Sequence, residues 1–301
     1  MKRTVRMGSR TLSLFLSLLL TAAVVKAQAA AQSEPAFTND PELTAAFRLL
    51  YIQKYAEARA GFEAWESQHE DDPFGPAAVA ASYLFEEFHH QGVLTSDFFL
   101  NEKRFLHGIE GEPNPQRMEG FDEAIGRTRK LAAKRLAKKP TDPEALYALT
   151  LCGGMESNSN MILRKHNLDA LKRLREANNH AKTLLAQRPN TYDAYVALGS
   201  ANYIIGSLNP GFRAMLWFGG FHGDKKLGMD QMSKCVESGR YLKPFAKIML
   251  GLAARREKQN VLAQKLFHEL SQEFPESSQY AVEYAKAMGR PVPAQMRSKD
   301  P

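Results

Sequence analysis

The segment Glu86–His90 brings together the residue types best suited to holding a metal ion. Glu86 and His90 are four residues apart, so on a helix they share one face, with a second histidine beside them. Asp97 or His107, from the segment that follows, would have to supply a further ligand. The order is not the H-E-x-x-H arrangement of zinc peptidases, and no third ligand has a fixed spacing. We therefore favour ordinary helix histidines and expect no metal and no cofactor.

Nucleophilic catalysis is the other chemistry to consider, and the two cysteines are its candidates. Cys152 precedes Gly153-Gly154, but the motif has no recognisable histidine partner. The sequence has neither a G-x-x-x-x-G-K-[ST] phosphate loop nor a G-x-S-x-G nucleophile turn. Cys152 and Cys235 could form a disulfide in an oxidising compartment, although we expect them on different layers of successive helix pairs and unbridged. These observations argue against an enzyme.

The segment from Arg127 to Lys139 is strongly basic. It holds seven lysines and arginines and no acidic residue, with a narrow apolar side formed by two leucines and an alanine. Such runs are usually solvated helix faces, and we favour that interpretation. The alternative is an anionic partner, such as lipid head groups or an acidic protein. Aromatic residues that would stack on bases are absent from the run, so we expect no nucleic-acid partner.

Residues 1–29 have the three parts of a secretory signal. A basic start precedes fifteen mainly apolar residues, Thr11–Val25, and then a small-residue stretch with the triplet Ala27-Gln28-Ala29. Removing these residues takes away five positive charges and no negative one, which lowers the net charge from +7 to +2. We predict a signal peptide over 1–29, a folded region over 30–290 and a disordered tail over 291–301. The protein is expected to be exported, in the periplasm or associated with the cell envelope. An uncleaved membrane anchor is the alternative.

The elements that position these residues are predicted to be helices. Most prolines fall between stretches of helical apolar periodicity, and proline suits the first turn of a helix but disrupts its interior. Asp40-Pro41-Glu42 and Asp142-Pro143-Glu144 repeat one helix-start signal, a capping acid followed by proline and a second acid. Period-two stretches rich in valine, isoleucine and threonine are absent. The predicted fold class is all-α.

A 34-residue helical repeat pattern is present near the carboxyl terminus. The segment Pro244–Ser277 matches the L-G, A-x3-F and P positions of W-x2-L-G-x2-Y, A-x3-F and P, while other residues occupy the Trp and Tyr positions. The residues that make the match are Leu250-Gly251, Ala263, Phe267 and Pro275. Leu198-Gly199 begins a second copy, and partial copies occur upstream. The chain resembles a tetratricopeptide repeat (TPR) protein of the exported bacterial type.

This resemblance implies a right-handed superhelical solenoid of about five TPR-like helix pairs, with a capping helix near 279–288. Three of the pairs carry insertions at the turn between their two helices, over 92–115, 156–167 and 207–223. Equivalent turns of a solenoid lie along one edge. We therefore expect all three insertions to gather on a single edge of the molecule.

The third insertion is dense in large apolar side chains. They are Phe212, Met215, Leu216, Trp217, Phe218 and Phe221. Over residues 202 to about 252, this context is similar to a eukaryotic TPR family linked to inclusion-body and lipid-droplet turnover, whose members are not secreted. We favour an apolar segment packed against the solenoid. The alternative is a hydrophobic partner groove or a membrane-surface contact.

The TPR resemblance implies a concave surface lined by the first helix of each pair. The residues expected there, and thus the candidate partner-binding site, are Tyr147, Leu151, Val196, Ser200, Asn202, Tyr203, Leu252 and Arg255. The predicted function is a non-enzymatic protein–protein interaction scaffold that binds a peptide or partner helix on this surface or at the inserted edge. The alternative is a membrane-surface or lipid-handling protein that uses the apolar insertion 209–223.

Overall fold

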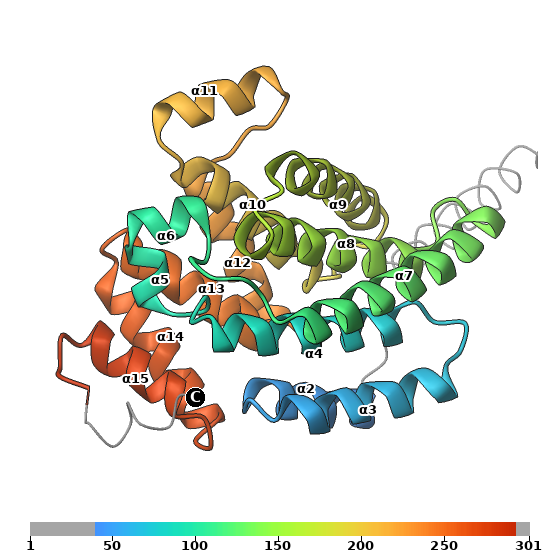
Figure 1. Cartoon of the computed structure of the whole chain (residues 1–301), viewed down its shortest axis with the longest axis horizontal. Coiled ribbons are helices and arrows are strands. Elements are labelled where there is room, and N and C mark those ends of the chain that lie inside the picture. Colours follow the sequence, from blue (N-terminus) through green and yellow to red (C-terminus); the bar gives the residue numbers. More distant parts are fainter. Residues whose placement is uncertain (1–39, 293–301) are drawn as a thin grey trace, which may run out of the picture.

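The computed structural model describes residues 40–292, so the predicted signal peptide and most of the predicted tail lie outside the described residues. Within this range the chain forms fourteen α-helices and one π turn, with no strand (Figure 1). The predicted all-α fold class is confirmed.

The helices follow one another with short connections, apart from the three insertions. Their bounds are α2 Pro41–Tyr51, α3 Tyr55–Gln68, α4 Phe74–His90, α5 Ser96–Leu100, α6 Glu102–His107, α7 Pro115–Lys138, α8 Pro143–Asn158, η1 (the π turn) Ser159–Leu163, α9 Asn167–Gln187, α10 Ala194–Ser207, α11 Pro210–Phe218, α12 Lys225–Ser238, α13 Lys243–Arg256, α14 Asn260–Glu273 and α15 Ser278–Ala287.

Side-chain caps define where several helices begin. The Asp40 carboxylate accepts from the backbone N–H groups of Glu42 and Leu43, at 2.8 and 3.0 Å. The Asp142 carboxylate accepts from the N–H of Ala145 at 3.0 Å. In both helices a proline occupies the first turn, where its missing N–H costs nothing. Both predicted start signals are confirmed.

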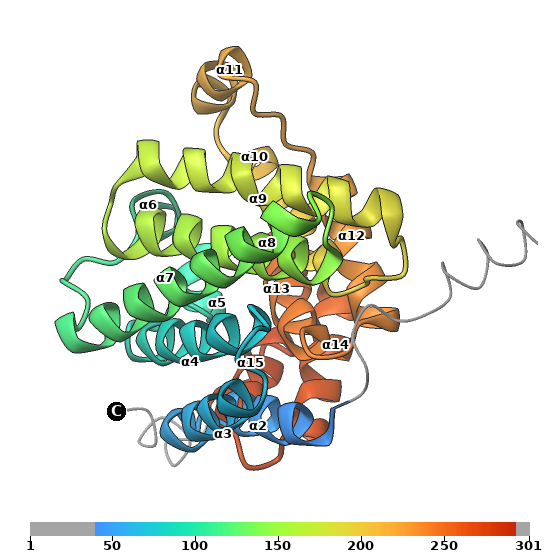
Figure 2. The same cartoon turned by 90° about the vertical axis from the view of Figure 1, so that its right-hand side faces the viewer.

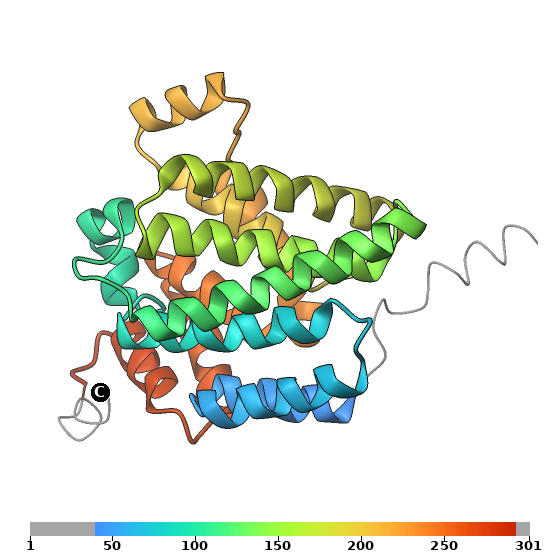
Figure 3. The ribbon, with the colours of Figure 1, turned by 45° about the vertical axis from the view of Figure 1, so that its right-hand side comes forward.

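Consecutive long helices pack side by side in chain order, as α4, α7, α8 and α9 do in Figure 3. A second set of contacts joins helices that are not neighbours in the chain: α4 packs on α8, α8 on α10, and α10 on α13. These four helices therefore form an inner row. The helices α3, α7, α9, α12 and α14 lie outside it.

The two ends of the described chain meet. The Tyr51 hydroxyl in α2 donates to the carbonyl of Tyr241 at 2.8 Å, and the Tyr280 hydroxyl in α15 donates to the carbonyl of Tyr51 at 2.9 Å. Arg48 forms an ion pair with Glu276 at 2.7 Å. As a result, α2 packs against the carboxyl-terminal helices and the inner row is enclosed on that side.

The three insertions gather on one edge of the molecule, at the left in Figure 3. The first contains α5 and α6, the second η1 and the third α11. The backbone N–H of Ile109 donates to the carbonyl of Ile162 at 3.0 Å, which joins the first insertion to the second. Arg175 in α9 donates to the carbonyl of Gly219, which ties the third insertion to the helix that follows the second.

Candidate functional site

Three of the predicted partner-binding residues are fully buried. Tyr147, Tyr203 and Leu252 have no exposed surface, so the prediction that they line a binding surface is wrong. The reason is packing within the inner row, which covers these positions. The Tyr203 hydroxyl donates to the carboxylate of Glu257 at 3.1 Å, and the Tyr147 hydroxyl donates to Asp193 at 3.4 Å.

Two more of these residues use their polar groups inside the fold. The Asn202 amide donates to Gln231 of α12 at 2.8 Å, and the Arg255 guanidinium donates to the carbonyl of Lys286 at 2.9 Å. Asn202 was expected to bond a peptide backbone. Its hydrogen bond instead joins the two helices of one pair, because α10 and α12 pack closely.

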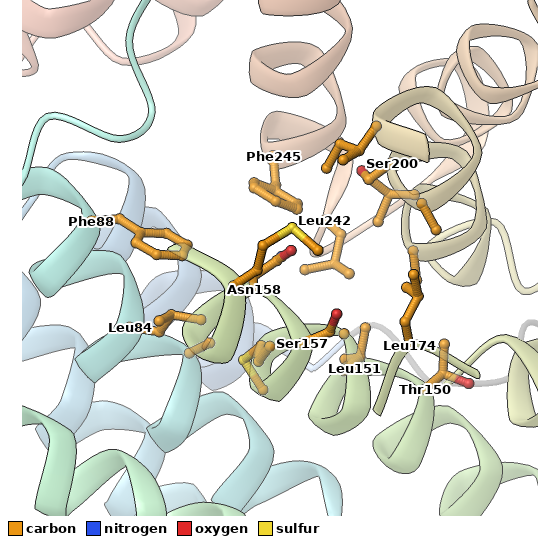
Figure 4. A pocket seen from close by; sticks show the side chains of 18 of the residues that line it. Leu84, Phe88, Thr150, Leu151, Ser157, Asn158, Leu174, Ser200, Leu242 and Phe245 are labelled. Carbon is orange, nitrogen blue, oxygen red and sulfur yellow. The ribbon is translucent and has the colours of Figure 1, made fainter. Parts of the chain in front are cut away.

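The other three predicted residues, Leu151, Val196 and Ser200, line a partly open cavity (Figure 4). The cavity lies among α4, α8, α9, α10 and α13 and has a volume of about 120 Å³. Its walls are almost entirely apolar, with contributions from Leu84, Phe88, Leu174, Leu242 and Phe245. Leu151, Val196 and Ser200 are thus the residues of the predicted concave surface that border a space available to a ligand.

Small side chains leave the cavity unfilled. Gly154 of α8 lines it, and a β-carbon added at Gly154 would have no atom within 4 Å. A β-carbon on the adjacent Gly153 would instead lie 3.0 Å from the β-carbon of Ala177 in α9. The pair Gly153-Gly154 therefore allows close helix packing on one side of α8 and leaves space on the other.

Four polar side chains reach the cavity wall. The Thr150 hydroxyl donates to the carbonyl of Leu146 at 2.8 Å, and the Ser200 hydroxyl lies 3.9 Å from the sulfur of Met232. Ser157 and Asn158 are the other two, and Asn158 points into the space between Leu242 and the phenylalanines (Figure 4). An amide can both donate and accept. Asn158 is therefore placed to orient a polar group of a ligand.

The apolar insertion is exposed rather than packed, so the interpretation of a segment buried against the solenoid is wrong. Helix α11 projects from the rest of the molecule (Figures 1 and 2). The exposed fractions of its side chains are 45% for Phe212, 59% for Met215, 60% for Trp217 and 84% for Phe218. Leu216 is the one buried side chain of this nine-residue helix.

The remaining face of the insertion turns inward. Leu216 is buried and lines the cavity together with Leu208, the residue that follows α10. Phe221 is half-buried, and the Arg175 guanidinium lies 4.6 Å from its ring centre. The insertion 209–223 thus closes one end of the cavity and at the same time presents an apolar outer surface.

Four of the seven basic side chains in the run 127–139 form ion pairs with neighbouring segments. Arg127 pairs with Glu66, Lys134 with Asp71, and Arg135 with Asp142, at 2.7 to 2.9 Å. Arg129 pairs with Glu156 and Glu176. The carboxyl-terminal half of α7 also lies far from α11, at the right of Figure 1. The run therefore joins helices and does not extend the apolar surface of α11.

The Glu86–His90 segment belongs to an ion-pair network. Glu86 pairs with Arg59 at 2.5 Å and with Arg117 at 3.6 Å, while the buried Glu87 accepts from Arg117 at 2.6 Å. His90 ends α4. Across residues 40–292 the structure places no group of three or more His, Cys, Asp and Glu side chains where they could hold a metal ion.

Both cysteines are free and buried. Cys152 lies 3.6 Å from a carboxylate oxygen of Glu156, and Cys235 lies 3.7 Å from one of Asp193. Burial raises the pKa of both thiols, and the nearby carboxylates raise it further. The raised pKa disfavours the thiolate that a nucleophile requires.

No family model, curated protein or solved structure matches this chain. None of the helices described in the structure has the length and apolar character needed to cross a membrane.

The cavity itself was not predicted from the sequence, and neither was the role of four residues that line it, Gly154, Asn158, Met161 and Leu208. The adjacent glycines at 153 and 154 were a signal that α8 passes close to another element. Which face of α8 is packed and which is open depends on contacts with α4 and α10, and these contacts are distant in the sequence.

Proposed function

We propose that this protein binds the aliphatic chain of a single-chain lipid in its apolar cavity, and that α11 contacts the membrane surface that supplies or receives the ligand. The observation that carries the proposal is the two-sided insertion 209–223. Leu216 faces the cavity, while Met215, Trp217 and Phe218 face solvent. An apolar cavity and an apolar outer surface are thus joined in one element, which is what a lipid-handling protein requires.

The size of the cavity favours a narrow chain. One water-sized position needs about 10–15 Å³ by this measure of volume, so a 120 Å³ space has room for about eight to twelve chain atoms. A peptide strand or partner helix is wider than this and carries backbone N–H and C=O groups that the apolar walls would leave without hydrogen bonds. An aliphatic chain has no such groups.

The composition of α11 supports a membrane-surface contact. Trp and Phe side chains are well suited to the boundary between head groups and acyl chains, because they combine a large apolar area with a compact shape. A short helix with an apolar outer face lies in the plane of that boundary and does not cross the bilayer. The proposal includes export, so the membrane would be one of the cell envelope.

The direct test is binding of decan-1-ol and octan-1-ol to the purified protein by isothermal titration calorimetry. Decan-1-ol should bind saturably, with one molecule per chain. Each buried methylene contributes about 0.8 kcal/mol, so octan-1-ol should bind about 15-fold more weakly. Absence of saturable binding, or equal affinity for the two alcohols, would contradict binding in the cavity.

Liposome flotation tests the role of α11. Wild-type protein should float with vesicles of phosphatidylethanolamine and phosphatidylglycerol, and Trp217→Ser should bind them at least about 10-fold more weakly. This estimate reflects about 1.5–3 kcal/mol for burying one large apolar side chain. Val261→Ser is the matched control, because Val261 is 82% exposed on α14 and lies outside the apolar insertion. If the wild type does not float, α11 is not a membrane contact.

The second candidate function is a protein–protein scaffold that uses the exposed face of α11. Aromatic and methionine side chains are enriched at protein interfaces, and α11 exposes two phenylalanines, a tryptophan and a methionine. In-cell crosslinking of wild type beside Trp217→Ser separates the two candidates. A protein that is captured by the wild type and lost in the variant, without flotation of either form, would favour the scaffold.

We also infer that the helix pairs are TPR-like units of a solenoid. Support comes from the small residues of the repeat pattern. A β-carbon added at Gly251 in α13 would lie 2.9 Å from the ring of Phe267 in α14. Gly251 and Phe267 both occupy defined positions of the repeat pattern. One added at Gly199 in α10 would lie 2.7 Å from the carbonyl oxygen of Gly228 in α12. Both pairs of helices therefore approach closely at the positions that the repeat reserves for small residues.

A further inference from the structure

A second hollow lies beside the apolar cavity, on the inserted edge. It has a volume of about 490 Å³ and is lined by the α6 region and by the turn after η1. Met161 lines both this hollow and the apolar cavity, so a single side chain is common to the two. Unlike the apolar cavity, the second hollow has a polar and basic lining. Its charged and titratable residues are Lys103, Arg104, His107, Glu110 and Lys165.

The backbone around Met161 departs from regular α-helix geometry. Helix α8 ends in the π turn η1, and Lys165 just after it has a φ of 61°, which is uncommon for a residue with a side chain. π turns within helices occur frequently at functional sites. Across the hollow, Gly108 has a φ of 76°, and a β-carbon there would lie 2.2 Å from the carbonyl oxygen of Ile162. Gly108 is thus required for the first insertion to approach the π turn.

The charge of the second hollow is positive. Three permanent cations, Lys103, Arg104 and Lys165, face one acid, Glu110, which gives a net charge of +2 with the histidine neutral. Glu110 pairs with Lys103 at 3.2 Å, but both side chains are about three-quarters exposed, so this pair is weak. Lys165 has no ion-pair partner among the described residues. Arg104 is held in place by a hydrogen bond to the carbonyl of Gln91 at 2.8 Å.

We propose that the ligand is an anionic amphiphile, a single-chain carboxylate whose head group lies in this basic hollow while its chain occupies the apolar cavity past Met161. The inference rests on the proposed function and adds the class of ligand to it. The argument for an anionic head group is charge complementarity, because the apolar cavity and the cationic hollow meet at Met161. A carboxylate has a single charge and two acceptor oxygens, which suits ammonium and guanidinium donors.

The test compares three ten-carbon probes that differ in head group: decanoate, decan-1-ol and decyltrimethylammonium. At low ionic strength, decanoate should bind at least about 10-fold more tightly than the cation, with the alcohol between them. Raising the salt concentration should reduce this difference, because the hollow is open to solvent.

The double variant Lys103→Gln, Lys165→Gln tests whether the preference for decanoate arises in the basic hollow. It should lose most of the preference for decanoate and bind decan-1-ol as the wild type does. The double variant Lys130→Gln, Lys138→Gln in α7 removes the same charge elsewhere and should keep the preference. If all three probes bind equally to the wild type, or if the first double variant retains the preference, the charged-head inference is overturned and the cavity proposal stands. If no probe binds saturably, the proposed function itself fails.

Discussion

A Gly154→Leu variant should bind decan-1-ol about 200-fold more weakly than the wild type, and it should unfold at the same temperature or a higher one. The β-carbon at position 154 points into open space that belongs to the cavity. A leucine would place four carbon atoms there and exclude a similar number of ligand carbons, each worth about 0.8 kcal/mol of binding. Leucine is also the better helix former, by up to about 1 kcal/mol.

The matched control for this variant is Gly126→Leu. Gly126 lies within α7, is exposed, and also has open space around its β-carbon position, but it does not line the cavity. It should give the same gain in helix stability with no change in affinity for decan-1-ol. Calorimetric titration and thermal unfolding of the two variants separate a blocked cavity from a damaged fold. Wild-type affinity in Gly154→Leu would show that the ligand binds elsewhere.

An Asp193→Ala variant should lower the free energy of unfolding by about 3–5 kcal/mol. Asp193 is buried just before α10, and its two carboxylate oxygens accept from the backbone N–H groups of Arg240 and Tyr241, at 2.6 and 3.0 Å. Alanine would leave these donors without an acceptor at the turn between α12 and α13, and each buried unsatisfied group costs about 1–3 kcal/mol. Tyr241 also accepts the hydroxyl of Tyr51, so the contact between the chain ends would weaken.

Urea denaturation measures this loss, with Asp224→Ala as the control. Asp224 caps α12 by accepting from the N–H of Leu227 at 2.9 Å, but it is exposed, so its loss should cost only about 1 kcal/mol. Equal losses in the two variants would contradict the role assigned to Asp193.

The stability that Asp193 contributes should also depend on pH, in a direction that its pKa determines. Burial raises the pKa of Asp193 in the folded protein. Folding therefore favours the protonated form, and the stability that Asp193 contributes is fully present below its unfolded pKa and decreases as the pH rises through its folded pKa. The difference in unfolding free energy between wild type and Asp193→Ala should accordingly be larger at pH 3.5 than at pH 7, a comparison that applies if both proteins remain folded at the lower pH.

Much of the fold could be predicted because its signals are local. A capping carboxylate such as Asp40 bonds N–H groups two and three residues away, and proline limits a helix through its own ring, so both act within one turn. The three insertions were recognisable as long segments between predicted helices. Their gathering on one edge follows from the packing of consecutive helices in chain order.

The candidate site depended on contacts that are distant in the sequence. Leu151, Val196 and Ser200 were predicted to face a partner, as were Tyr147 and Tyr203, and no property of the residues themselves separates the two groups. The first three border the cavity, whereas the two tyrosines are covered by packing within the inner row. The exposure of α11 was misjudged for the same reason, since apolar composition does not say whether a surface is available to cover it.

The all-α class, the helix starts and the positions of the insertions follow from the sequence alone, because each depends on residues within a few positions of one another. Which helix faces are packed against other helices, and which border open space, depends on the tertiary structure. Gly153 and Gly154 are identical and adjacent, yet one is in contact with Ala177 and the other borders empty space. The difference arises because successive helix residues point about 100° apart, and the packing of α4, α9, α10 and α13 around α8 occupies one of those directions and leaves the other open.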